Sequence, residues 1–88
     1  RTVSREARSL AIRIKAIDAR LADHEAQIAD LETMFSRPDQ FGAPAQLAAS
    51  GEQYRKLKEY VQSLWEEWER LSLEAERVDS RLETLKAN

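Results

Sequence analysis

His24 is the residue to test first for chemistry, because it is the only histidine in a chain that has no cysteine. Imidazole and thiolate are the main protein ligands for zinc, and a site needs three or four ligands at matching spacing. With no second ligand of either kind, we expect no metal centre and a histidine packed in a helix seam. The alternative is a weak pH sensor, because charging an imidazole within an apolar seam is unfavourable.

The sequence also lacks the other arrangements that support catalysis. Neighbouring carboxylates such as those of Glu66 and Glu67 point to different sides of a helix. There is no glycine-rich phosphate loop, and an extended helical chain without a pocket cannot bring serine, histidine and aspartate together. We therefore expect this chain to be no enzyme and to bind no cofactor.

Two rows of basic side chains are candidates for binding nucleic-acid phosphates, because a backbone of regularly spaced negative charges favours such rows. Their members recur at intervals of seven or fourteen residues: Arg1, Arg8 and Lys15 in the first half, and Lys56, Arg70 and Arg77 in the second. A row of glutamates lies beside the second group at Glu69, Glu76 and Glu83. The formal net charge is −2, which argues against strong unaided binding. The alternative interpretation is solubilising charge.

Three large apolar residues fall outside the expected core and are candidates for contact with a protein partner: Trp65, Ile12 and Leu73. An aromatic side chain that stays exposed can anchor a protein interface. The alternative is that Trp65 covers the edge of the seam and that the other two are ordinary surface residues.

The elements that position these residues follow from a heptad pattern. In each half, apolar or small residues recur at alternating steps of four and three, which predicts long helices that pair along a narrow seam. In the first half they are Val3, Ala7, Leu10, Ile14, Ile17, Leu21, His24, Ile28, Leu31 and Phe35. In the second half they are Leu47, Ser50, Tyr54, Leu57, Val61, Leu64, Trp68, Leu71, Ala75, Val78, Leu82 and Leu85.

The segment SRPDQFGAP, residues 36–44, separates the two halves. A residue before proline is biased away from the α region, and proline is well tolerated at the first position of a helix. We therefore predict a helix over about 2–36, a turn over 37–43 and a helix over about 44–86. Gly51 weakens the start of the second helix by about 1 kcal/mol relative to alanine.

Together these features predict an all-α fold, a two-helix antiparallel coiled-coil hairpin that forms a single domain over residues 1–88. Charged residues make up 34% of the chain and the mean hydropathy is −0.65, so a long two-helix contact suits it better than a globular core. No apolar run has the length of a membrane span or a signal peptide, and we expect a cytoplasmic location. Because the chain starts within the heptad pattern and without methionine, we expect it to be a piece of a larger protein.

The charges on the helix flanks predict how the two halves align. If facing seam residues have numbers that sum to 85, Ile17 faces Trp68 and His24 faces Val61. The flank pairs are then all attractive: Arg20 with Glu67, Arg13 with Glu74, Glu6 with Arg81, and Glu25 with Lys58. A shift by one heptad would instead place Arg13 against Arg81. Exposed ion pairs contribute only ~0.2–1 kcal/mol each, so they select the alignment more than they stabilise it.

The turn and the second helix carry a family resemblance. The segments MFSRPDQFGAP, PAQLAASGEQYRKLKEY and LWEEWERLSLE resemble the carboxy-terminal coiled-coil domain of ABC-F ATPases, over roughly residues 8–75. Pro38, Asp39 and Phe41 match the family's turn with Pro and Asp transposed. Trp68, Glu69 and Leu71 match its aromatic-rich element, with Glu67 where arginine is usual. The second helix also continues beyond the usual end of the domain.

The resemblance implies a non-catalytic arm of a cytoplasmic protein with two ATP-binding cassettes. ATP and Mg²⁺ would bind to other domains of the parent chain, and the arm would contact DNA, ribosomal RNA or the ribosome. The alternatives are a protein-interaction arm or rigid spacer that does not bind nucleic acid, and a hairpin that opens so that two chains pair. We expect a monomeric hairpin, with a dimer as the alternative.

Overall fold

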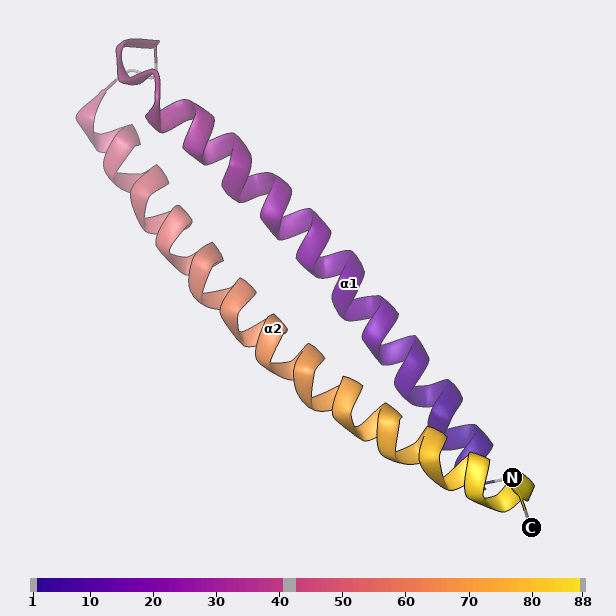
Figure 1. Cartoon of the computed structure of the whole chain (residues 1–88). Coiled ribbons are helices and arrows are strands. Elements are labelled where there is room, and N and C mark those ends of the chain that lie inside the picture. Colours follow the sequence, from indigo (N-terminus) through magenta and orange to yellow (C-terminus); the bar gives the residue numbers. More distant parts are fainter. Residues whose placement is uncertain (1, 41–42, 88) are drawn as a thin grey trace.

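The computed structural model describes residues 2–40 and 43–87, which form two long helices joined by a short turn. Helix α1 spans Thr2–Phe35, the 3₁₀ helix η1 spans Pro38–Gln40, and helix α2 spans Pro44–Ala87. Figure 1 shows α1 and α2 lying side by side and antiparallel, with the start of α1 and the end of α2 at the end opposite the turn. The described residues contain no strand. The predicted all-α helical hairpin is confirmed.

The turn is formed by local hydrogen bonds on both sides of Pro38. The backbone N–H of Ser36 donates to the carbonyl of Glu32 at 3.1 Å, and the N–H of Arg37 donates to the carbonyl of Met34 at 3.0 Å. The last helical bonds of α1 are therefore made before the proline, which has no N–H to donate. On the other side, Ala43 accepts the first bonds of α2 from two backbone N–H groups. Phe41 and Gly42, which belong to the predicted turn, lie outside the described residues.

The core is a single continuous strip between the two helices. Its buried cluster consists of Leu10, Ile17, Leu21, Leu64, Leu71 and Val78. Partly buried seam residues pack against the cluster: Val3, Ala7, Ile14, Val61, Trp68, Ala75 and Leu82. Ile28 and Leu31 are buried beyond His24, on the side of the turn. The central layers predicted from the heptads, including the one that pairs Ile17 with Trp68, belong to this cluster.

The predicted alignment of the helices is supported by an ion pair at the end away from the turn. A guanidinium nitrogen of Arg81 lies 2.8 Å from a carboxylate oxygen of Glu6. This contact excludes the alternative shifted by one heptad, in which Arg81 would face Arg13. Glu25 and Lys58 line one groove on the flank, and Arg13 and Glu74 line another, as the same alignment requires.

The prediction that the other three flank pairs form ion pairs is wrong. Within the described ranges, the ion pairs closer than 4 Å join Arg81 to Glu6 and Arg55 to Glu52 and Glu59. Arg20, Arg13 and Lys58 therefore do not bind the carboxylates predicted for them. The physical reason is that exposed charges gain little from pairing in water and lose side-chain entropy. The ammonium of Lys58 lies instead over the ring of Tyr54, at 5.7 Å from its centroid.

The molecule is a thin rod, with extents of 67 × 16 × 15 Å for the Cα atoms. Neither described helix has the length and apolar character needed to cross a membrane. Every side chain of such a rod is close to its surface, so any function depends on which residues share a face.

Candidate nucleic-acid interface

The helix seam divides the surface of the hairpin into two broad faces. The heptad positions are lettered a to g, with Ala7 and Tyr54 at a positions and Leu10 and Leu57 at d positions of the seam. Positions g and c lie on one side of the seam, and positions e and b lie on the other, because residues three and four apart are neighbours on a helix. We call these the g face and the e face. A groove with Glu6, Arg13 and Glu74 in its lining runs along the g face, and a groove with Glu25 and Lys58 in its lining runs along the e face.

The predicted basic rows lie on opposite faces. Arg8 and Lys15 are at b positions of α1, which places them on the e face. Lys56, Arg70 and Arg77 are at c positions of α2, which places them on the g face. All five side chains are exposed, and Arg1 lies outside the described residues. The two rows therefore cannot form one continuous phosphate-binding surface.

Two further arginines join the second row on the g face, and the sequence argument missed both. Arg13 and Arg20 are at g positions of α1, are exposed, and make no ion pair within the described part of the chain. Lys56 of that row lies nearer the turn, in the groove with His24. We call the four arginines farther from the turn the arginine quartet; its members are Arg13, Arg20, Arg70 and Arg77. The sequence had assigned Arg13 and Arg20 to glutamates of α2. Their availability follows only from the three-dimensional positions of the charged groups.

The predicted partner-contact residues are exposed but do not share a surface. Trp65 is 43% exposed and lies on the e face, where its ring packs edge-on against that of Trp68 at 5.7 Å. Ile12 and Leu73 are 70% and 51% exposed, at f positions that point away from the seam on α1 and α2 respectively. They therefore lie on opposite edges of the rod. The three residues form no common patch.

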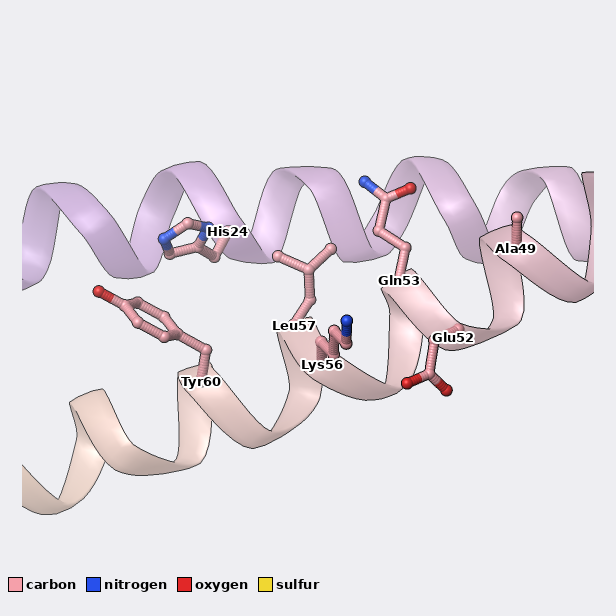
Figure 2. Close-up of a pocket in the computed structure, with 7 residues that line it drawn as sticks. All are labelled: His24, Ala49, Glu52, Gln53, Lys56, Leu57 and Tyr60. Atoms are coloured by element: carbon pink, nitrogen blue, oxygen red, sulfur yellow. The ribbon is translucent and has the colours of Figure 1, made fainter.

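His24 lies in an open groove on the g face, closer to the turn. The groove has a volume of about 450 Å³ and is lined by Ala49, Glu52, Gln53, Lys56, Leu57 and Tyr60 in addition to His24. Figure 2 shows His24 of α1 and Tyr60 of α2 converging from the two helices. Their rings make an edge contact with a centroid distance of 4.9 Å. Among the described residues, the Nδ1 atom of His24 is buried without a hydrogen-bond partner.

The chemistry of this groove is limited by what surrounds the imidazole. No three of the residue types that bind metals come together in the part of the chain that the structure describes. The groove contains no serine, threonine or cysteine that His24 could activate as a nucleophile. His24 is a seam residue, as the sequence predicted, and it packs against Tyr60.

One arginine on the surface of α2 is committed to carboxylates. Arg55 lies 2.6 Å from Glu52 and 2.6 Å from Glu59, one turn away on either side. The hydrogen bond from Arg55 lowers the pKa of the Glu52 carboxyl, and the same contact raises the pKa of Arg55. Two carboxylates therefore compensate the positive charge of Arg55, whereas the members of the arginine quartet make no ion pair among the described residues.

These features define the chain as an elongated helical-hairpin domain with charged faces. Its described residues assemble no catalytic or metal-binding group. The sequence model of the ABC transporter C-terminal domain matches residues 5–73. The chain belongs to this family. It is thus a C-terminal domain of an ABC transporter-type ATPase, as the resemblance indicated, and a domain of this kind is not itself catalytic. Comparisons with curated proteins and with solved structures found no match to the chain.

Proposed function

We propose that the chain is the C-terminal arm of an ABC-F ATPase and that it contacts nucleic acid, either DNA or ribosomal RNA, in the cytoplasm. The sequence has no glycine-rich loop that could hold the phosphates of ATP and its Mg²⁺. ATP and Mg²⁺ would bind to the cassettes of the parent protein. The role of the arm is therefore contact and positioning.

The observation that carries this proposal is the state of the predicted basic residues. Arg8, Lys15, Lys56, Arg70 and Arg77 are all exposed, and none makes an ion pair among the residues described. Guanidinium and ammonium groups that are free of carboxylates can neutralise phosphates and release the counterions condensed on them. The net charge of −2 does not prevent this, because attraction depends on the local charge within about one Debye length, ~8–10 Å.

The test is binding of the 88-residue chain to fluorescently labelled duplex DNA and to an RNA hairpin, measured by anisotropy at 50 and 200 mM salt. We expect binding at the lower salt concentration and a marked loss at the higher one. Changing Arg1, Arg8, Lys15, Lys56, Arg70 and Arg77 together to glutamine should abolish binding. Arg55→Gln is the matched control, because Arg55 is already paired with two glutamates. No binding of the unchanged chain to either probe would contradict the proposal.

A rigid spacer is the second candidate, and the shape of the molecule favours it. A rod with a long axis of 67 Å can hold two other parts of a protein apart without binding nucleic acid. A protein-interaction arm has less support, because Trp65, Ile12 and Leu73 point in three directions. The spacer role predicts no binding to DNA or RNA at any salt concentration, so the same anisotropy measurement separates the candidates.

A further inference from the structure

We infer that the g face holds the phosphate backbone of a nucleic-acid duplex through the arginine quartet, without reading the base sequence. This inference rests on the proposed function and narrows it to one face, one set of side chains and one mode of contact. The e face, with Arg8 and Lys15, would then point away from the duplex.

The members of the quartet are regularly spaced along the hairpin. The Glu6–Arg81 contact fixes the level of the helices on this flank, so facing residues have numbers that sum to 87. Arg77 and Arg70 of α2 are then level with residues 10 and 17 of α1. The quartet forms a ladder that alternates between the helices in the order Arg77, Arg13, Arg70, Arg20. Its length is ten residues or ~15 Å, which spans about four phosphates at ~3.4 Å per phosphate along one strand.

The two faces differ in net charge over this stretch. On the g face, the four arginines have two glutamates between them, Glu67 and Glu74. On the e face, Arg8 and Lys15 are accompanied by three acids, Asp18, Glu69 and Glu76. The g face is therefore net positive and the e face net negative. Asp23 and Asp30, at c positions of α1, end the positive region on the side of the turn.

The positions of the aromatic residues distinguish between a duplex and a single strand as the ligand of the g face. Proteins that bind single strands stack bases on exposed aromatic rings. The stretch of the g face that carries the quartet has no aromatic residue; Tyr60 lies nearer the turn and packs on His24. Trp65 lies on the other face, beside Asp18 and Glu69. The cations are thus separated from any stacking platform, which favours a duplex over a single strand.

The width of the hairpin limits its access to the base edges of a duplex. The major groove of B-DNA is ~12 Å wide and admits a single α-helix. The hairpin measures 16 × 15 Å across its Cα atoms alone, so the face that carries the quartet cannot enter this groove. The deep, narrow major groove of duplex RNA is not readable by side chains either. The hairpin therefore reads base edges in neither major groove, and the quartet contacts the phosphate backbone, which DNA and RNA duplexes share.

The experiment measures the salt dependence of binding to two 20-bp DNA duplexes of unrelated sequence, an RNA duplex and a DNA single strand. Four phosphate contacts predict a slope of log K against log[salt] of about −3.6, equivalent to roughly 150-fold between 50 and 200 mM. We expect both DNA duplexes to bind equally and the single strand to bind more weakly. If the chain binds one duplex type, DNA or RNA, more tightly than the other, the tighter duplex identifies which nucleic acid supplies the phosphate backbone. Tighter binding of the single strand, or a tenfold sequence preference, would overturn the inference.

Matched variants test the face. Changing the quartet to glutamine should remove binding, whereas Arg8→Gln with Lys15→Gln should leave the slope unchanged. Changing the quartet to lysine should retain the slope, because phosphate contact requires charge and not the planar shape of arginine. This variant also controls for a loss of folding, which is checked by circular dichroism.

Acidic variants give a test in the opposite direction. Glu67→Gln with Glu74→Gln should strengthen binding to duplex, and Glu69→Gln with Glu76→Gln on the e face should strengthen it less. Binding that survives the quartet change and is lost with Arg8 and Lys15 would overturn the inference while leaving the proposed function in place. A chain with no affinity for any probe would overturn both.

Discussion

His24 places a polar ring where the heptad pattern calls for an apolar side chain. Its Nδ1 atom is buried and has no hydrogen-bond partner in the part of the hairpin that the structure describes, and the buried Nε1 atom of Trp68 has none there either. A buried polar atom without a partner costs about 1–3 kcal/mol. Each of these residues therefore lowers the stability of the seam relative to an apolar residue of similar size.

The first prediction is that His24→Leu stabilises the chain by about 1 kcal/mol. Leucine removes the unpartnered nitrogen and buries apolar surface, and these gains exceed the loss of the edge contact with Tyr60, ~0.5–1.5 kcal/mol. Urea unfolding followed by circular dichroism measures the difference. His24→Gln keeps a polar group in the seam and should give no gain. A leucine variant that unfolds at lower urea concentration would show that the imidazole contributes more than its packing.

The second prediction concerns Glu52 and Arg55. The hydrogen bond from Arg55 lowers the pKa of Glu52 below its ordinary value of 4.5 in the folded chain. This contact therefore stabilises the fold fully above that value, and the contribution is lost as the pH falls through the lowered pKa. In an NMR titration of the carboxyl carbon, Arg55→Ala should raise the pKa of Glu52. An unchanged midpoint would mean that the 2.6 Å contact is not maintained in solution.

The sequence was sufficient to place His24 in the seam, and it was insufficient to determine whether the flank arginines form ion pairs. A seam position follows from spacing alone, because burying the apolar stripe determines it. Whether Arg13 binds Glu74 is decided by a small difference between Coulomb attraction, hydration and side-chain entropy. No pattern of residue types encodes this difference, so the free arginines emerged only from the structure.

At the scale of the elements, α2 remains helical through Gly51. Its Cα faces open space: beyond the adjacent residues and the backbone of its own helix, a Cβ atom added there would meet no atom of the described residues within 4 Å. The third prediction is that Gly51→Ala stabilises the chain by about 1 kcal/mol, the difference in helix propensity between the two residues. Thermal unfolding measures the effect. Ala49→Gly, one half-turn earlier on an exposed position, should cause a loss of similar size. No change for either substitution would indicate that this part of α2 does not unfold together with the rest.

The fourth prediction concerns the apolar seam. Leu71 is 1% exposed at the centre of the core cluster, whereas Leu85 is 61% exposed near the end of α2. Leu71→Ala should cost about 2–5 kcal/mol, because it removes buried methyl groups and leaves a cavity. Leu85→Ala should cost less than about 0.5 kcal/mol. Denaturant unfolding of both variants tests this, and similar losses would contradict a core confined to the strip between the helices.

At the scale of the whole molecule, the hairpin could be predicted because several independent signals agree. The heptads specify two seams, the proline-rich segment separates them, and the flank charges favour one alignment. Which residues of the two helices share a face could be stated only once the alignment was known. A heptad position on one helix does not say which positions of the other helix lie beside it. This is why Arg8 and Arg70 were grouped as equivalent candidates from sequence although they lie on opposite sides of the rod.

The alignment of the two helices within one chain is the claim on which the face assignment depends. The chain has no native cysteine, so spin labels can be placed selectively at Ser4→Cys and Asp79→Cys, two exposed e positions that the alignment brings opposite each other. Helices that pack at ~8–10 Å between axes place these labels within about 25 Å. Samples diluted with a tenfold excess of unlabelled chain report only distances within one molecule.

The most direct measurement is the distance between these labels by double electron–electron resonance. We predict a single distribution below about 25 Å that is unchanged by dilution with unlabelled chain. A distance near 110 Å, as in one unbroken helix at ~1.5 Å per residue, would contradict the hairpin. A short distance that disappears on dilution would show that two chains pair, and the g face would then combine arginines from different molecules.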